Sequence, residues 1–152
     1  MLVLSTAIPA NGQTAGVGGP EGVSCAVVSR QIRVMVVDDT DHVRRMLTSM
    51  LSLDGFDVVG GASGGPEALA GIDAADPDIV VIDYKMPGMD GLSTARRIRA
   101  LRPDQTMILY TAYVDDDIQR QAADAGISVV LGKVEGLASL EREISRLCAS
   151  LP

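Results

Sequence analysis

Three aspartates stand at the ends of two short apolar runs in this 152-residue sequence. Asp38 and Asp39 follow residues 32–37, and Asp83 follows residues 78–82. Such β-branched runs are typical of buried parallel strands, so we expect these acids at strand ends. Carboxylates that gather in one place repel one another unless a cation or protons share the site. Oxygen ligands without His or Cys suit magnesium, so the acids predict a Mg²⁺ site.

A hydroxyl and an amine close two further runs of the same kind. Thr111 follows residues 106–110, and Lys133 stands just beyond residues 128–131. A carboxylate beside a divalent cation can attack phosphorus and form an acyl phosphate. The cation and a lysine then neutralise charge on the transferred group, while a hydroxyl donates a hydrogen bond to it. Asp83, Lys133 and Thr111 match these three roles, which indicates phosphoryl chemistry.

Each of these residues also has an ordinary structural interpretation. Asp38 and Asp39 can cap a helix, Thr111 can belong to a turn, and Lys133 can be a solvated surface lysine. Their shared place at strand ends favours the chemical interpretation. His42, the single histidine, is expected on the exposed flank of a helix and not in phosphotransfer.

The elements that must position these groups alternate regularly along the chain. Strands are expected at 32–37, 56–59, 78–82, 106–110 and 128–131, and helices from 41 and at 67–75, 92–101, 116–125 and 137–147. This alternation predicts an α/β fold, a doubly wound parallel sheet with helices on both faces. Ligands of such sheets bind beyond the carboxyl ends of the strands, so the polar residues should meet at one edge.

Helical spacing assigns the apolar faces of the first and third helices. The side chains expected in the core are Val43, Met46, Leu47, Met50 and Leu51, and Leu92, Ala95, Ile98 and Leu101. Asp41 is expected to cap the first helix. The four arginines of the third helix, Arg96, Arg97, Arg99 and Arg102, are expected on its solvated face. Cys148 is expected to be a small buried hydrophobic residue.

Composition limits the class of protein. The length fits one domain, residues 31–150, behind a leader at 1–30 that is rich in Gly, Ala, Ser and Val. The leader shows no helical or strand period and is expected to be flexible or disordered. The net charge of −7 argues against direct DNA binding. No apolar run is long enough to span a membrane. A secretory signal would require a positively charged start, but no Lys or Arg precedes Arg30. We therefore expect a cytoplasmic protein.

Several ordered motifs of residues 32–150 resemble the response regulator receiver family of two-component signalling. The acidic pair after the first strand, the segment Asp-Tyr-Lys-Met-Pro-Gly-Met-Asp-Gly at 83–91, Thr111 and Lys133 follow the family's order. The resemblance implies a flavodoxin-like sheet of strand order 2-1-3-4-5. It also implies that Asp83 accepts a phosphoryl group, with Thr111 as the switch hydroxyl.

The resemblance further implies a ligand set for magnesium. In addition to Asp83, Asp39 would bind the ion directly, Asp38 would bind it mostly through water, and the backbone carbonyl of Lys85 would complete the site. The sequence departs from the family at Val134, where a proline after a cis bond is usual, and at Val130, where an aromatic residue is common. We expect a trans bond before Val134 and a reshaped loop, because a cis bond before a non-proline residue costs about 2.5–4 kcal/mol.

These features predict a receiver that is not an enzyme. A histidine kinase or phosphotransfer protein would phosphorylate Asp83, and a downstream protein target would recognise the result. A second copy of the chain, in a homodimer, is also among the expected partners. No effector domain is expected after Leu151. The alternative is a pseudo-receiver that binds proteins regardless of phosphorylation, which Val130 and Val134 favour. A phosphatase with an aspartate nucleophile usually has a second acid two residues later, where Lys85 stands instead.

Overall fold

A computed structural model describes residues 30–149. The expected leader therefore lies, apart from Arg30, outside the described residues. The strands are β1 (Arg33–Val37), β2 (Asp57–Ala62), β3 (Ile79–Ile82), β4 (Thr106–Thr111) and β5 (Val129–Gly132). The helices are α2 (Asp41–Leu53), α3 (Gly65–Ala75), α4 (Gly91–Leu101), α5 (Asp116–Asp124) and α6 (Leu137–Leu147), with a 3₁₀ turn, η3, at Lys133–Glu135.

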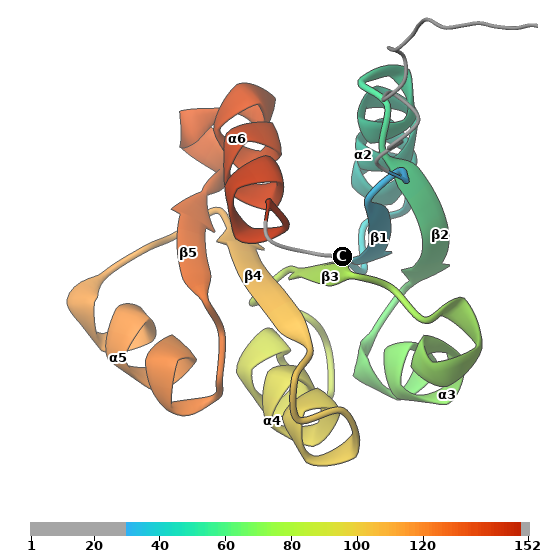
Figure 1. Cartoon of the computed structure of the whole chain (residues 1–152). Coiled ribbons are helices and arrows are strands. Elements are labelled where there is room, and N and C mark those ends of the chain that lie inside the picture. Colours follow the sequence, from blue (N-terminus) through green and yellow to red (C-terminus); the bar gives the residue numbers. More distant parts are fainter. Residues whose placement is uncertain (1–29, 150–152) are drawn as a thin grey trace, which may run out of the picture. The chain divides into compact units, whose positions relative to one another are not determined.

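The five strands form one parallel sheet in the order β2-β1-β3-β4-β5. Helices α2 and α6 lie on one face and α3, α4 and α5 on the other (Figure 1). This arrangement confirms the predicted doubly wound α/β fold and its strand order. The order reverses at β1 and β3, so their carboxyl ends flank the place where ligands of such sheets bind.

The sheet separates two apolar clusters, because successive side chains of a strand point to opposite faces. In β1, Val34 and Val36 face α2 and α6, while Met35 and Val37 face α3 and α4. The first cluster also contains Leu47 and Leu51 of α2 with Leu140, Ile144 and Cys148 from the α6 end. The second contains Ile72, Leu92, Ala95, Ile98, Ile118 and Ala122. Cys148 is thus buried as predicted.

Strand β2 is longer than predicted. The sequence indicated residues 56–59, but the strand runs from Asp57 to Ala62, through Gly60 and Gly61. Glycines usually weaken a strand, which is why the pattern suggested an earlier end. Pairing with β1 maintains the strand, although the register shifts by one residue between Val34 and Met35 of β1.

Several side-chain expectations for α2 and α4 are wrong. Met46 and Met50 are 51% and 41% exposed, and Leu101 is 56% exposed. The helical stripe that reaches the sheet is narrower than the apolar pattern, so Leu47 and Leu51 alone are buried in α2. Asp41 does not cap α2: Thr40 is the N-cap, and Asp41 pairs with Arg44 and Arg45.

Two of the four arginines of α4 have structural partners. Arg96 and Arg97 are exposed, as predicted. Arg99 donates to the carbonyls of Pro103 and Gly126. Arg102 pairs with Asp73 and Asp76 at 3.3 and 2.7 Å, and hydrogen-bonds Gln105. These two therefore join α4 to neighbouring loops, in contrast to the solvated role that was expected.

The peptide bond before Val134 is trans, as predicted. Lys133–Glu135 forms a single 3₁₀ turn, and no cis peptide bond occurs between residues 30 and 149. The Gly132 amide donates to Glu135 Oε2 at 3.0 Å, which closes the turn. Val134 is 91% exposed, so the residue in the usual proline position projects away from the core.

Candidate functional site

Asp38 and Asp39 leave β1 at the carboxyl edge of the sheet. The Asp38 amide donates to the Ala62 carbonyl at 3.0 Å, which continues the β1–β2 pairing by one residue. The Asp38 side chain is buried, and its Oδ1 accepts a hydrogen bond from the Thr40 amide at 2.9 Å. Asp39 is exposed. The two neighbouring carboxylates therefore have different environments, one fixed by the protein and one open to solvent.

Asp83 leaves the adjacent strand β3 at the same level. Its amide donates to the Val37 carbonyl at 2.8 Å, and the residue is 9% exposed. The loop after it closes where the Gly91 amide donates to the Tyr84 carbonyl at 2.8 Å. A Cβ at Gly91 would stand 2.2 Å from the Asp83 carbonyl oxygen, so only glycine fits there. The Asp90 carboxylate caps α4 by accepting from Ser93.

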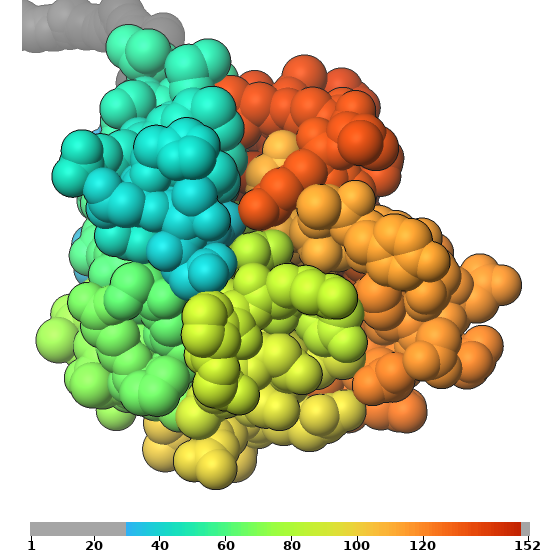
Figure 2. Space-filling model, turned by 180° about the vertical axis from the view of Figure 1, so that it is seen from behind, coloured from blue at the N-terminus to red at the C-terminus, as the bar shows by residue number. Residues whose placement is uncertain are grey.

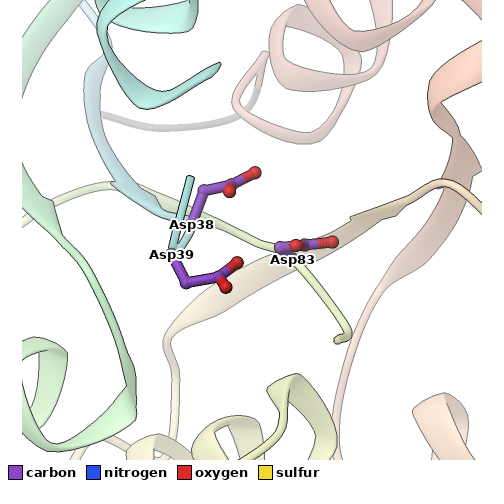
Figure 3. A group of neighbouring side chains, drawn as sticks. All are labelled: Asp38, Asp39 and Asp83. Carbon is purple, nitrogen blue, oxygen red and sulfur yellow. The ribbon is translucent and has the colours of Figure 1, made fainter. Parts of the chain in front are cut away.

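The three carboxylates converge (Figure 3). One oxygen from each of Asp38, Asp39 and Asp83 lies within 4.8 Å of the others. In Figure 2 the start of α2 lies beside the segment that follows β3. Asp39 shares an open pocket of about 460 Å³ with that segment. The cluster is therefore accessible from solvent.

Lys133 completes the cluster from the end of β5. Its Nζ lies 3.0 Å from Asp38 Oδ2 and 3.5 Å from Asp83 Oδ1. Burial opposes the charge of the ammonium group, but the hydrogen bond that it donates to Asp38 and the charges of both aspartates outweigh burial and raise the pKa of Lys133. The amine is therefore held in its charged form between two carboxylates.

Burial is also the main influence on Asp83. It raises the pKa of this carboxyl, the Lys133 charge lowers it, and the Asp38 charge raises it again, with a net increase. An ionised Asp83 is thus costly, and a further cation would relieve that cost.

Thr111 and Lys85 lie at the same edge. Thr111 ends β4, the strand next to β3, is 1% exposed and pairs with Gly132 of β5, just before Lys133. The Tyr113 amide approaches its Oγ1 at 3.5 Å. Lys85 is exposed and lines the pocket with Asp39. The structure thus gathers the predicted residues from four strands at one edge.

The roles of two residues of this region were not predicted from the sequence. Gly91 permits the close approach to the Asp83 carbonyl, and Arg44 donates from Nη1 to the Asp38 carbonyl at 2.7 Å. The glycine ends the loop motif at 83–91, so the motif marked its position but not its steric role. The arginine gives no such signal, since its neighbour Arg45 is the same residue type and lies on the surface.

The donor set fits magnesium. The cluster offers carboxylate oxygens without His or Cys, one buried ligand held by the protein and one exposed ligand able to share an ion with water. A hard cation that retains part of its water shell prefers this combination.

A doubly wound sheet of this order, with acids and a lysine at its carboxyl edge, defines a receiver-like signalling fold. The model of the response regulator receiver domain family matches residues 34–145. The chain therefore belongs to this family, which acts in two-component signalling.

Among the described residues, no helix has both the length and the apolar character to cross a bilayer.

Known relatives agree with this assignment. The response regulator GacA of Pseudomonas viridiflava is 39% identical over 114 residues, which cover 74% of this chain and 53% of GacA. The transcriptional regulatory protein PdtaR of Mycobacterium tuberculosis is 34% identical over 122 residues, covering 80% of this chain and 58% of PdtaR. The chain thus spans a little over half the length of these curated relatives.

Solved structures show the same fold. The signal receiver domain of the putative response regulator NarL from Mycobacterium tuberculosis has a TM-score of 0.71 and 32% identity, covering 82% of this chain and all of that domain. The response regulator TrrA of Thermotoga maritima, solved in complex with Mg(2+)-BeF, has a TM-score of 0.69 and 29% identity, covering 77% of this chain and 99% of that one.

Proposed function

We propose that this chain is a phosphoacceptor receiver that takes a phosphoryl group onto Asp83 from a histidine kinase or a phosphotransfer protein. The convergence of Asp38, Asp39, Asp83 and Lys133 carries the proposal. Such a group of acids with one amine is costly to assemble without a charged ligand. TrrA, a family member solved with Mg(2+)-BeF, supports the choice of ligand.

Asp83 is the nucleophile in this proposal. One of its oxygens forms a bond to phosphorus while the bond from phosphorus to the donor imidazole nitrogen breaks, and that nitrogen keeps the electron pair and takes a proton from solvent. Lys133 lies 3.5 Å from Asp83 and keeps its charge, so it favours the ionised carboxylate and neutralises charge on the incoming group. Thr111 would donate its hydroxyl hydrogen to a phosphoryl oxygen.

Magnesium would be held by Asp38, Asp39, Asp83 and the Lys85 carbonyl. When bound, it would supply positive charge at the transferring phosphoryl oxygens. The protein's own contribution is to hold Asp38 rigidly and to leave Asp39 facing the open pocket.

The output of the phosphorylated state is proposed to be a protein contact. The net charge of −7 supports a protein target over nucleic acid. The receiver is proposed to act as a two-state module, without turnover of its own, in which phosphorylation shifts the population of conformations.

The decisive experiment is the intact mass of the chain after incubation with acetyl phosphate and MgCl₂. We expect the parent to gain one phosphoryl group and the Asp83→Asn variant to gain none. The Asp90→Asn variant is a matched control, because Asp90 caps α4 in the same loop and is not one of the three clustered carboxylates. A parent that stays unmodified while still binding a protein partner would support a pseudo-receiver instead.

A further inference from the structure

The backbone and side chain of Asp38 are held at every polar atom. Its amide donates to Ala62, its Oδ1 accepts from Thr40, and its Oδ2 accepts from Lys133. Its carbonyl oxygen accepts from Arg44 Nη1 at 2.7 Å. The contact with Ala62 belongs to the sheet, the contact with Thr40 is local, and the contact with Lys133 belongs to the cluster. The contact with Arg44 comes from the first turn of α2.

The Asp39 carboxylate has no comparable support. Between residues 30 and 149, no protein group donates a hydrogen bond to it or pairs with it, and it is exposed. Its direction therefore depends on the backbone from which it leaves. The Asp38 carbonyl and the Asp39 amide share one planar peptide unit, so a contact that fixes that carbonyl also fixes the start of Asp39.

The contacts of the Arg44 side chain hold it in place to donate to the Asp38 carbonyl. Its planar guanidinium uses a second nitrogen, Nη2, to pair with Asp41 Oδ1 at 2.7 Å, which fixes its orientation. The side chain is 21% exposed, and its Cδ lies 3.5 Å from the place of a Cβ at Gly61, so its stem packs along the bare backbone of β2.

We propose that Arg44 is a positioning residue for the metal, and that it orients Asp39 through the Asp38–Asp39 peptide. This inference rests on the proposed function, because it concerns the same magnesium site. It adds a residue that touches neither the ion nor the phosphoryl group. Substitution of such supporting residues typically lowers metal affinity about 10- to 100-fold.

A charge effect and a positioning effect predict opposite results. A guanidinium close to a cation site repels the cation, so removal of its charge alone would strengthen Mg²⁺ binding. Loss of the contact to the Asp38 carbonyl would weaken binding, because Asp39 would sample more directions. The sign of the change therefore distinguishes the two.

Arg45 supplies a matched control. It is the next residue, has the same charge and also pairs with Asp41 at 2.7 Å, but its side chain is 79% exposed. Arg44→Gln and Arg45→Gln thus each remove one positive charge and one ion pair with Asp41. Only Arg44→Gln removes a described contact to the Asp38 carbonyl.

Calorimetric titration with MgCl₂ tests the proposal on the full chain. We expect Arg44→Gln to weaken Mg²⁺ binding about tenfold, Arg45→Gln to change it less than twofold, and Arg44→Lys to fall between, since one ammonium group does not reproduce the planar two-nitrogen contact. In acetyl phosphate labelling, the Mg²⁺ concentration for half-maximal rate should rise in Arg44→Gln, while the rate at saturating Mg²⁺ stays close to that of the parent. Circular dichroism reports whether each variant is folded.

Three outcomes would overturn the inference. Equal losses in the two glutamine variants would indicate an effect through Asp41, with which both arginines pair, and tighter binding in Arg44→Gln would indicate repulsion. An unchanged affinity would show that Asp39 needs no such support. These results would leave the proposed function intact, whereas a parent chain that binds no Mg²⁺ would remove both proposals together.

Discussion

At the residue scale, the charge of Asp83 at the candidate site lowers the stability of the fold. The Asp83 side chain is 11% exposed, and its carboxyl lies beside Asp38 and has a pKa raised chiefly by burial. A carboxyl whose pKa is higher in the folded than in the unfolded state destabilises the fold when ionised. That cost is present above the folded pKa and disappears as the pH falls below the unfolded value.

We therefore expect Asp83→Asn to be more stable than the parent at neutral pH without metal, by on the order of 1 kcal/mol. The neutral amide has similar size and no charge, so the cost of burying the charge is lost, together with the repulsion from Asp38. The gain should shrink as the pH is lowered and the parent carboxyl takes up its proton. Urea unfolding of both proteins across the acidic range measures this. A variant less stable than the parent at neutral pH would show that the Lys133 pair outweighs burial.

The residues of the site were predictable because each follows a strand-like run. Asp38, Asp39, Asp83 and Lys133 lie together, as sequence reasoning expected from the edge of a parallel sheet. Their chemical roles stay predictions that the phosphorylation experiment tests. The contact of Arg44 with the Asp38 carbonyl was not predictable, since it depends on the rotamer and on space beside Gly61.

At the element scale, the junction between β3 and α4 depends on one glycine. A Cβ at Gly91 would lie 2.2 Å from the Asp83 carbonyl oxygen, 3.0 Å from its carbonyl carbon and 3.0 Å from Tyr84 Cα, and all three are backbone atoms. Backbone atoms cannot swing aside as a side chain can. The start of α4 must therefore move if this residue carries a side chain.

We expect Gly91→Ala to destabilise the chain by about 2–3 kcal/mol and to lower the rate of labelling by acetyl phosphate. Gly71→Ala is the matched control, because Gly71 lies inside α3 and a Cβ there meets nothing within 4 Å. That change should stabilise by about 0.5–1 kcal/mol through the better helix propensity of alanine. Thermal unfolding of the two variants makes the comparison, and destabilisation of similar size in both would contradict it.

Element types were predicted better than their ends and faces. The alternation of apolar runs and helical stripes indicated all five strands and five long helices. The end of β2 was not predictable, because Gly60 and Gly61 look like a turn and only pairing with β1 extends the strand through them. Met46, Met50 and Leu101 match an apolar stripe in spacing, but the width of the buried face depends on how each helix sits on the sheet.

At the scale of the whole molecule, the proposed ligands come from two strands that are neighbours in the sheet but far apart in the sequence. Asp38 and Asp39 end β1, and Asp83 ends β3. A cation that binds all three binds the folded state and not the unfolded chain. Its affinity therefore adds to global stability by mass action.

We expect MgCl₂ to raise the unfolding temperature of the parent, with a stabilisation of about 2.7 kcal/mol at a concentration one hundred times the dissociation constant. Asp39→Asn should lose most of this response, whereas Asp54→Asn, at the end of α2 and outside the cluster, should keep it. Differential scanning fluorimetry at constant ionic strength measures the shift. An equal response in the two variants would show that the ion acts elsewhere.

The distribution of aromatic residues gives this chain a built-in optical reporter. The sequence has no tryptophan and three tyrosines. Tyr84 directly follows Asp83, Tyr110 directly precedes Thr111, and Tyr113 is two residues beyond it. All three tyrosines thus stand beside site residues in the sequence, so tyrosine emission should change on addition of Mg²⁺ or acetyl phosphate without any label. An emission spectrum unaffected by either ligand would contradict this expectation.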